Sequence, residues 1–141
     1  MLFAPKAIIT DVKLLQGDFQ KSKSVFVPGR PYHSLSYRIA GTVTTSWQDQ
    51  TLVSKQGTLT FIPKGVGYHT SILESGRLMV IYFNCMEEYD ALFPMVLTPK
   101  QSRTFENHFK ALAEIYRPGM EQDYQCLAWA YHILADFDSQ L

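Results

Sequence analysis

Residues 8–83 consist of short runs of strand-forming residues separated by turn residues, and this spacing limits the possible folds more than any other feature of the sequence. The turn residues include Pro28-Gly29, Gly41 and the segment 63–67. Between them lie eight candidate strands, at residues 8–15, 24–27, 33–40, 42–47, 50–55, 58–62, 68–73 and 77–83. Short strands at this spacing predict an antiparallel barrel or sandwich, so the fold is expected to be mainly β.

The sequence after Asn84 has the periodicity of α-helices instead. The segment 98–101, TPKQ, combines a capping threonine, a proline at the first helical position and a glutamine three residues after the cap. These residues predict a helix that starts at Thr98, and the segment 117–119, RPG, ends it. A shorter helix over 86–93 is also expected, which gives two to three C-terminal helices in all.

The last predicted helix, over about 120–139, has two apolar faces. One face, with 3-4-3 spacing, carries Tyr124, Leu127, Tyr131 and Leu134. The other carries Trp129, Ile133 and Phe137. One face can pack on the strands or on the preceding helix, while the other is either core or a contact for a second copy of the chain. We assign the first face, residues 124, 127, 131 and 134, to dimerisation.

We expect one structural domain with two parts, a β-barrel at residues 1–84 and a helical segment at 85–141 that packs on it. The 141 residues are enough to bury a conventional core. The Lys and Arg residues number 13, as do the Asp and Glu residues, and they form no basic stripe. This chain alone is therefore not expected to bind DNA. The sequence has no apolar run long enough to span a membrane and no export signal, so we expect a cytoplasmic protein with its two cysteines reduced.

The stretch 57–65, GTLTFIPKG, resembles the second conserved motif of the cupin superfamily. In metal-dependent cupins, a histidine after this motif completes a site with two histidines in an HxH and a glutamate from the first motif. The corresponding first stretch here, residues 33–41, has one histidine, His33, and no acid, because Leu35 stands where the second histidine would be. With His69 this leaves two ligands, too few for a metal site in the barrel. We expect no metal, no cofactor and no catalytic residue, and the alternative is a stand-alone cupin enzyme such as an isomerase or dioxygenase.

A longer series of segments resembles the N-terminal sensor domain of AraC-type transcriptional regulators. The series comprises RPYH at 30–33, LSYRIAG at 35–41, the stretch 57–63, LMVIYF at 78–83 and YHIL at 131–134. This resemblance implies a cupin-type double-stranded β-helix barrel that binds a small effector, often a sugar, and C-terminal helices that form a homodimer. It also implies a bacterial regulator whose helix-turn-helix DNA-binding domain is expected after Leu141. A third possibility is an oligomerisation module with a vestigial pocket.

Strand alternation and the resemblance together select the residues that would contact an effector. The resemblance places Ala40 at a pocket-lining position, and Arg38 shares its face of the strand. In the last strand, Leu78, Val80 and Tyr82 form the set that matches the face of Arg38 and Ala40. Of the neighbours His69 and Thr70, only one can point inward. The candidate ligand-binding residues are Arg38, Ala40, Trp47, His69, Thr70, Leu78, Val80 and Tyr82. Competing interpretations are a surface position for Arg38, a core position for Tyr82 and a barrel cap for Trp47.

Overall fold

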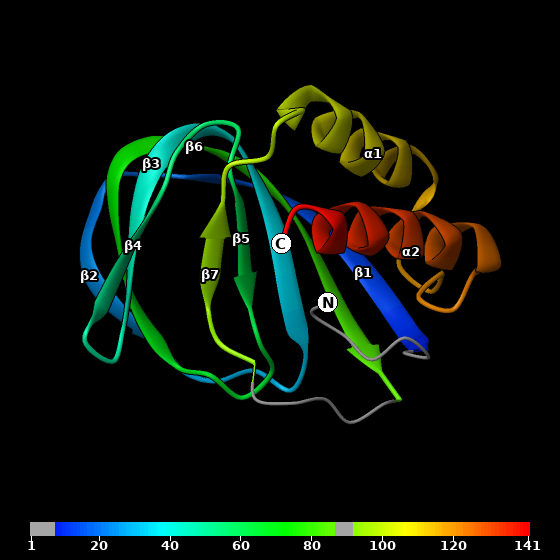
Figure 1. Ribbon diagram of the computed structural model, residues 1–141, viewed down its shortest axis with the longest axis horizontal. Coiled ribbons are helices and arrows are strands. Elements are labelled where there is room, and N and C mark those ends of the chain that lie inside the picture. Colours follow the sequence, from blue (N-terminus) through cyan, green and yellow to red (C-terminus); the bar gives the residue numbers. More distant parts are fainter. Residues whose placement is uncertain (1–7, 87–91) are drawn as a thin grey trace.

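The computed structural model describes residues 8–86 and 92–141, and in this part of the chain seven strands form one antiparallel sheet that two helices follow (Figure 1). The strands are β1 (Ile9–Phe19), β2 (Ser22–Val27), β3 (His33–Trp47), β4 (Gln50–Ser54), β5 (Leu59–Ile62), β6 (Tyr68–Cys85) and β7 (Met95–Leu97), and the helices are α1 (Ser102–Ile115) and α2 (Tyr124–Ser139). The main order is β1-β6-β3-β5-β7, with β2 on β6 and β4 on β3. The expected mainly β fold with C-terminal helices is confirmed, and of the two to three helices expected, two are found among the described residues.

The long strands β3 and β6 each belong to both halves of the sheet. The start of β3 pairs with the end of β6, where Leu35 lies opposite Ile81. The end of β3 pairs with the start of β6, where Thr45 lies opposite Thr70. The first half is completed by β1, β5 and β7, and the second by β2 and β4. The two halves can therefore face each other across a space between them.

Both long strands bend at a glycine where the halves meet. Gly41 has φ +91°, a conformation that L side chains rarely adopt. A Cβ added at Gly76 would lie 2.0 Å from the carbonyl oxygen of Ala40, so the backbones touch here. The pairing of the two strands also shifts register between Arg38 and Val43. The strand breaks predicted at Gly41 and at residues 74–76 are thus bends inside continuous strands, because the ladder resumes on both sides.

The predicted helix start at Thr98 is wrong, because α1 begins at Ser102. Residues 95–97 were not predicted as a strand, but they form β7 and pair with β5, which holds the chain extended up to Leu97. The buried Pro99 lies in the connection after β7 instead of at the first helical position. Tertiary strand pairing has overridden the local capping signal here. Most of the helix predicted over 86–93 lies outside the described residues.

Helix α2 begins at Tyr124, four residues later than predicted, because Asp123 caps it. The Asp123 carboxylate accepts hydrogen bonds from the backbone N–H groups of Gln125 and Cys126, at 3.0 and 3.1 Å. Such a cap satisfies donors that have no partner inside the helix. The cap therefore fixes where the final helix starts.

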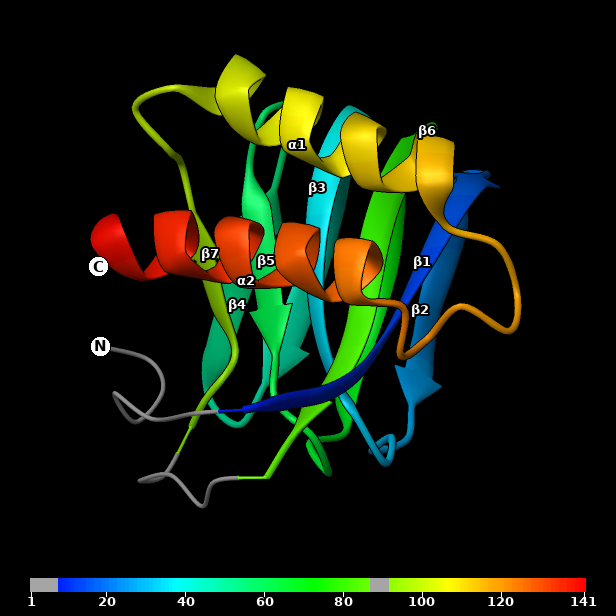
Figure 2. The ribbon, with the colours of Figure 1, turned by 90° about the vertical axis from the view of Figure 1, so that its right-hand side faces the viewer.

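Both helices lie across one face of the sheet, and the main hydrophobic core lies beneath them (Figure 2). Ring contacts join the layers, with centroids 6.2 Å apart for Tyr37 and Phe109 and for Phe61 and Phe137. The other core residues from all parts of the fold include Val12, Leu35, Leu59, Ile81, Phe83, Phe105, Leu112, Ala130, Ile133 and Leu134. Burial of each large side chain contributes about 1.5–3 kcal/mol. Most of the stabilising apolar contact thus lies between sheet and helices.

Strand β1 is hydrogen-bonded to the segment around α2 near its first residues. The backbone N–H of Ile9 donates to the Tyr131 hydroxyl at 2.7 Å, and the N–H of Val12 donates to the carbonyl of Glu121 at 2.9 Å. The same strand pairs with β6 from Ile9 to Phe19. One strand thus connects the helical layer with the far end of the sheet.

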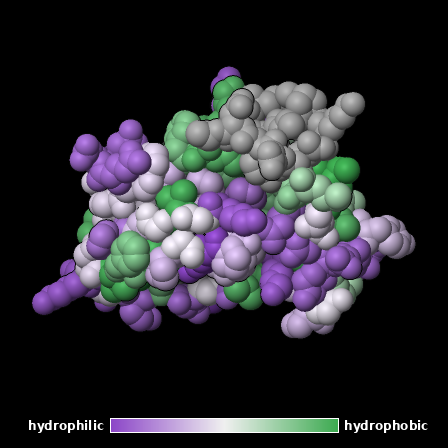
Figure 3. Space-filling view, turned by 90° about the horizontal axis from the view of Figure 1, so that it is seen from below, coloured by the Kyte–Doolittle hydropathy of each residue, from purple (hydrophilic) through white to green (hydrophobic). Residues whose placement is uncertain are grey.

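The surface seen from below is mostly hydrophilic, and its hydrophobic side chains form separate patches instead of one continuous area (Figure 3). Within the described residues, no helix is both long and apolar enough to cross a lipid bilayer.

Candidate ligand-binding cavity

A cavity of about 210 Å³ lies between the two halves of the sheet. It uses the face of β3 opposite to the core, because side chains alternate along a strand and Ser34, Ser36 and Arg38 line the cavity while Leu35 and Tyr37 lie in the core. Its lining residues are Phe19, Arg30, Ser34, Ser36, Arg38, Val43, Thr45, Thr60, Ile62, Tyr68, Thr70, Ile72, Leu78, Val80 and Tyr82. The lining combines hydroxyl groups, apolar side chains and two guanidinium groups, and within residues 8–86 and 92–141 no carboxylate contributes to it.

Arg38 is the most unusual side chain of the cavity, because it is only 6% exposed although it is charged. Its Nε donates to the Ser54 hydroxyl at 2.8 Å, and its guanidinium carbon lies 4.7 Å from the centre of the Phe19 ring. One terminal nitrogen is buried without a hydrogen-bond partner among the described residues. Burial lowers the pKa of Arg38 to about 10, so the group stays positive at neutral pH. A buried cation with an unused donor is costly unless an anion completes it.

A network of hydroxyl groups holds the Nε edge of the Arg38 guanidinium. Ser54 accepts from Arg38 and from the Thr60 hydroxyl at 3.1 Å, and its oxygen lies 3.2 Å from the Thr58 hydroxyl. The Thr58 hydroxyl in turn donates to the carbonyl of Lys55 at 2.8 Å. The guanidinium is thereby fixed at one edge, while one of its terminal nitrogens has no acceptor among the described residues.

A second arginine lines the cavity together with aromatic side chains. Arg30 donates to the Tyr82 hydroxyl at 3.2 Å, and its guanidinium carbon lies 5.5 Å from the centre of the same ring. The Tyr32 ring packs edge-on against Tyr82 with centroids 4.6 Å apart. Burial raises the pKa of Tyr68, which keeps its hydroxyl protonated as a donor. This group of side chains offers flat surfaces and hydrogen-bond donors to the cavity.

Five of the predicted ligand-binding residues line the cavity together, namely Arg38, Thr70, Leu78, Val80 and Tyr82. Three others do not line it. Ala40 lies in the bend between the sheet halves, where the pairing of β3 with β6 shifts register. The regular alternation of side chains that points Arg38 into the cavity therefore does not continue to Ala40. His69 is exposed because its neighbours Tyr68 and Thr70 take the inward positions on β6. Trp47 forms the last residue pair of the β3–β4 hairpin, opposite Gln50.

The hydroxyl-bearing residues Ser34, Ser36, Thr45 and Thr60 also line the cavity, although they were not among the predicted residues. A signal for two of them was present, since Ser34 and Ser36 share the face of Arg38 in the sequence pattern. Thr60 faces the cavity because β5 pairs with β3, where Thr60 lies opposite Ser36. The position of Thr45 depends on the folding of one sheet half over the other. Periodicity within one strand carries no information on that arrangement.

The two histidines from the cupin-like stretches have different surroundings. His33 is buried beside Phe61 and Phe83, and its Nδ1 accepts from the backbone N–H of Lys64 at 2.9 Å. Burial lowers the pKa of His33 to about 4. The ring of His69 packs instead against Phe26, with centroids 5.1 Å apart. Neither histidine lines the cavity.

The four residues assigned to dimerisation do not share one surface. Tyr124 and Tyr131 are exposed, at 77% and 41%, while Leu127 is half-buried against the core. Leu134 is only 6% exposed and belongs to the core of the single chain. The buried stripe of α2 consists of Cys126, Ala130, Ile133, Leu134 and Phe137. The exposed stripe therefore runs through Tyr124 and Tyr131.

No protein-family model matches the chain, and no curated protein matches it. Among solved structures, it is similar to the AraC-like transcriptional activator CuxR, with a TM-score of 0.68 and 11% identity over 93% of this chain and 52% of that chain. It is also similar to apo ToxT from Vibrio cholerae, with a TM-score of 0.63 and 6% identity over 92% of this chain and 56% of that chain.

A cupin-2 domain containing protein from Shewanella frigidimarina aligns with 55% of this chain and 78% of its own, at 18% identity and a TM-score of 0.44. The chain spans about half the length of CuxR and of ToxT. At these identities the similarity to CuxR and to ToxT establishes a shared fold. Nearly all of this chain, including both helices, is part of the fold shared with CuxR.

Proposed function

We propose that this chain is the effector-sensing and dimerising part of a bacterial, cytoplasmic AraC-type transcriptional regulator, built on a cupin-type double-stranded β-helix. DNA binding belongs to another domain, since this chain has no net charge. The support is the fold shared with an AraC-like transcriptional activator over 93% of the chain, together with a cavity between the sheet halves.

The effector we propose is a compact polar molecule with an anionic group, such as a sugar acid or a sugar phosphate. The observation that carries this proposal is the buried guanidinium of Arg38, which lines the cavity and has one nitrogen without a partner, while the described lining residues include no carboxylate. Guanidinium groups bind carboxylate and phosphate through charge-assisted hydrogen bonds. The hydroxyl groups of Ser34, Ser36 and Thr45 suit the hydroxyls of a sugar. The volume, about 210 Å³, is below the usual range for drug-sized ligands and suits a molecule of monosaccharide size.

Sensing is proposed in place of catalysis because of what lines the cavity. The described lining residues include no histidine, cysteine, aspartate or glutamate. These residue types supply most general bases, and a serine or threonine hydroxyl needs an adjacent general base to act as a nucleophile. Because the described lining residues lack such a base, their hydroxyl and guanidinium groups are suited to binding and orienting a ligand.

Thermal unfolding with a panel of neutral sugars, sugar acids and sugar phosphates tests the proposed ligand class. A ligand that binds only the folded state stabilises it by mass action, so at least one anionic compound is expected to raise the melting temperature. Arg38→Met keeps a similar volume and should abolish this rise. Arg103→Met, a change at an exposed arginine on α1, is the matched control and should keep it.

Two results would count against the proposed ligand class. The first is a panel in which no anionic compound changes the melting temperature. The second is a rise that Arg38→Met and wild type share equally, which would place the ligand elsewhere.

The proposed dimer contact is the exposed stripe of α2 through Tyr124, Ala128 and Tyr131. Sedimentation of a Tyr124→Asp, Ala128→Asp variant tests it, because both side chains are exposed and their replacement does not disturb the core. The wild type is expected to be a dimer and the variant a monomer. A monomeric wild type, or a variant that still forms the same dimer, would contradict the assignment.

A further inference from the structure

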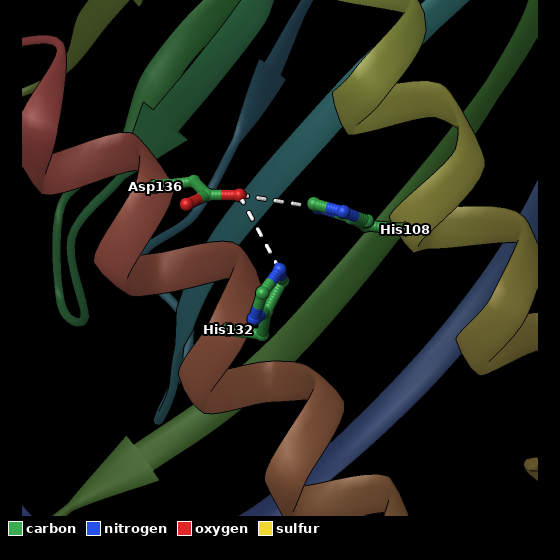
Figure 4. Close-up of side chains that lie close together, drawn as sticks. All are labelled: His108, His132 and Asp136. Carbon is green, nitrogen blue, oxygen red and sulfur yellow. Dashed lines mark ion pairs between the residues drawn. The ribbon is translucent and has the colours of Figure 1, made fainter.

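A cluster of two histidines and one aspartate joins the two helices on the side away from the cavity residues. His108 projects from α1 toward α2, where His132 and Asp136 lie one helical turn apart (Figure 4). The His108 Nδ1 is 3.2 Å from an Asp136 carboxylate oxygen, and the His132 Nε2 is 3.7 Å from the same oxygen. One potential ligand atom from each residue lies within 4.8 Å of the other two.

These separations are close to those of a metal site. A zinc ion bound at 2.0–2.1 Å in a tetrahedron has ligand atoms about 3.3 Å apart, and the distances of 3.2 and 3.7 Å from the two imidazole nitrogens to the carboxylate oxygen lie on either side of that value. Two imidazole nitrogens and one carboxylate oxygen form a ligand set that Zn²⁺ and similar divalent ions prefer. Small side-chain rotations would bring the three atoms around one ion.

The hydrogen bonding of the cluster leaves one imidazole nitrogen without an aligned partner among the described residues. The Nδ1 of His108 is buried and makes no aligned hydrogen bond with any described residue, although the Asp136 oxygen is only 3.2 Å away. An imidazole nitrogen that faces a carboxylate at this distance needs a proton or a cation between them. The exposed fractions of the His132 and Asp136 side chains, 55% and 38%, allow an ion and a water molecule to reach the site.

The surroundings favour one ion shared by both helices. The His108 and His132 rings meet edge-on with centroids 4.4 Å apart, and the Trp129 ring lies 5.7 Å from each. These contacts restrict both imidazoles, and an ordered set of ligands loses less entropy when it binds a metal. The indole also places a fluorophore beside the site.

We propose that His108, His132 and Asp136 bind one divalent transition-metal ion of the Zn²⁺ type, which cross-links α1 to α2 and keeps a fourth position for water or another ligand. Such an ion would fix the angle between the helix that carries the proposed dimer stripe and the helix packed beside it. The proposal is independent of the cavity ligand, since none of the three residues lines the cavity.

Calorimetric titration of chelator-treated protein with Zn²⁺ tests the site. We expect one ion per chain and, at a free concentration of about 100 times Kd, a melting temperature raised by roughly 5–10 °C. His132→Ala and Asp136→Asn alter partly exposed side chains, so both variants are expected to fold and to bind Zn²⁺ at least about tenfold more weakly. His69→Ala removes an exposed histidine elsewhere and should bind like the wild type.

Fluorescence gives a second measurement, because Co²⁺ bound at the site should quench Trp129 in wild type and in Trp47→Phe, but not in His132→Ala.

The absence of saturable Zn²⁺ binding would overturn the proposal. So would equal binding by wild type and His132→Ala, or half an ion per chain, which would indicate ligands shared between two copies. The Arg38→Met variant should bind Zn²⁺ normally, so failure of the cavity proposal and failure of the metal proposal can be distinguished.

Discussion

The two faces of strand β3 differ in chemistry although they share one backbone. Leu35 and Tyr37 point toward the helices and are part of a core with Phe109 and other large apolar residues. Ser36 and Arg38, their immediate neighbours, point into the cavity. In most antiparallel sheets a polar face contacts solvent. Here the second half of the sheet faces it, so polar groups are enclosed without belonging to the core.

Stability and binding can thus depend on alternate residues of one strand. Substitutions on the helix-facing side should change mainly the free energy of unfolding. Substitutions on the cavity side should change mainly ligand binding. The following predictions test this separation.

The largest loss of stability is expected for Phe109→Ala on the helix-facing side. Phe109 is fully buried and contacts Tyr37 of β3, so its removal leaves a cavity in the core. The expected cost is about 3–5 kcal/mol in the free energy of unfolding, measured by urea denaturation. Asn107→Ala, at an exposed position of α1 outside the proposed dimer stripe, should change it by no more than about 0.5 kcal/mol. A small effect of Phe109→Ala would mean that the helices do not form part of the main core.

A smaller but still large loss is expected for Gly76→Ala, which affects both sheet halves. The new Cβ would meet the Ala40 carbonyl at 2.0 Å, and backbone atoms must move to accommodate it. We expect a cost of at least about 2 kcal/mol by urea denaturation. Gly17→Ala is the matched control in β1, because nothing lies within 4 Å of its Cβ position. Equal stabilities of the two variants would argue against the close crossing of β3 and β6.

The pH dependence of stability should report the burial of His33. Its pKa is about 4 in the folded protein and 6.5 in the unfolded chain, so the unfolded chain binds more protons between these values. The contribution of neutral His33 is therefore fully present above pH 6.5 and is lost as the pH falls toward 4. Unfolding free energies at pH 7, 6, 5 and 4.5 should decrease in that order, and His33→Gln should reduce the slope. An unchanged slope in that variant would assign the pH dependence to other groups.

The smallest effect on stability is expected for Arg38→Met, on the cavity side. It removes a buried charge that lacks a full set of partners, and apolar replacement of such groups is often neutral or stabilising. Without ligand, the free energy of unfolding should stay equal or rise by up to about 1 kcal/mol. A loss of 2 kcal/mol or more would show that Arg38 supports the fold itself, which would remove the distinction between the two faces.

Much of this arrangement could be predicted from local pattern. The short strand-forming runs of residues 8–83 predict the sheet, and side-chain alternation in the first part of β3 places Arg38 away from the core. The helical spacing of Phe105, Phe109 and Leu112 marks the buried face of α1. In contrast, Ala40 was misplaced because its position depends on the contact with Gly76, which is distant in sequence. The choice between His69 and Thr70 depends likewise on which half of the sheet faces the other.

The errors at the helices have the same physical origin. Thr98 carries a good local capping signal, but β7 pairs with β5 and keeps the preceding chain extended. Leu134 fits a surface stripe by spacing, yet it packs in the core because α2 is rotated toward the sheet by its contacts. The cluster of His108 with His132 and Asp136 joins two helices, and sequence spacing alone indicates only the pair on α2.

Strand β1 ends at Phe19, whose ring lies over the Arg38 guanidinium, and begins at Ile9, whose N–H is bonded to Tyr131 of α2. A guest molecule that pairs with Arg38 must share space with the Phe19 ring. The continuous pairing of β1 with β6 between these two residues joins the cavity wall to the final helix through one regular element. A displacement of Phe19 would therefore act on the same strand that carries the hydrogen bond to Tyr131.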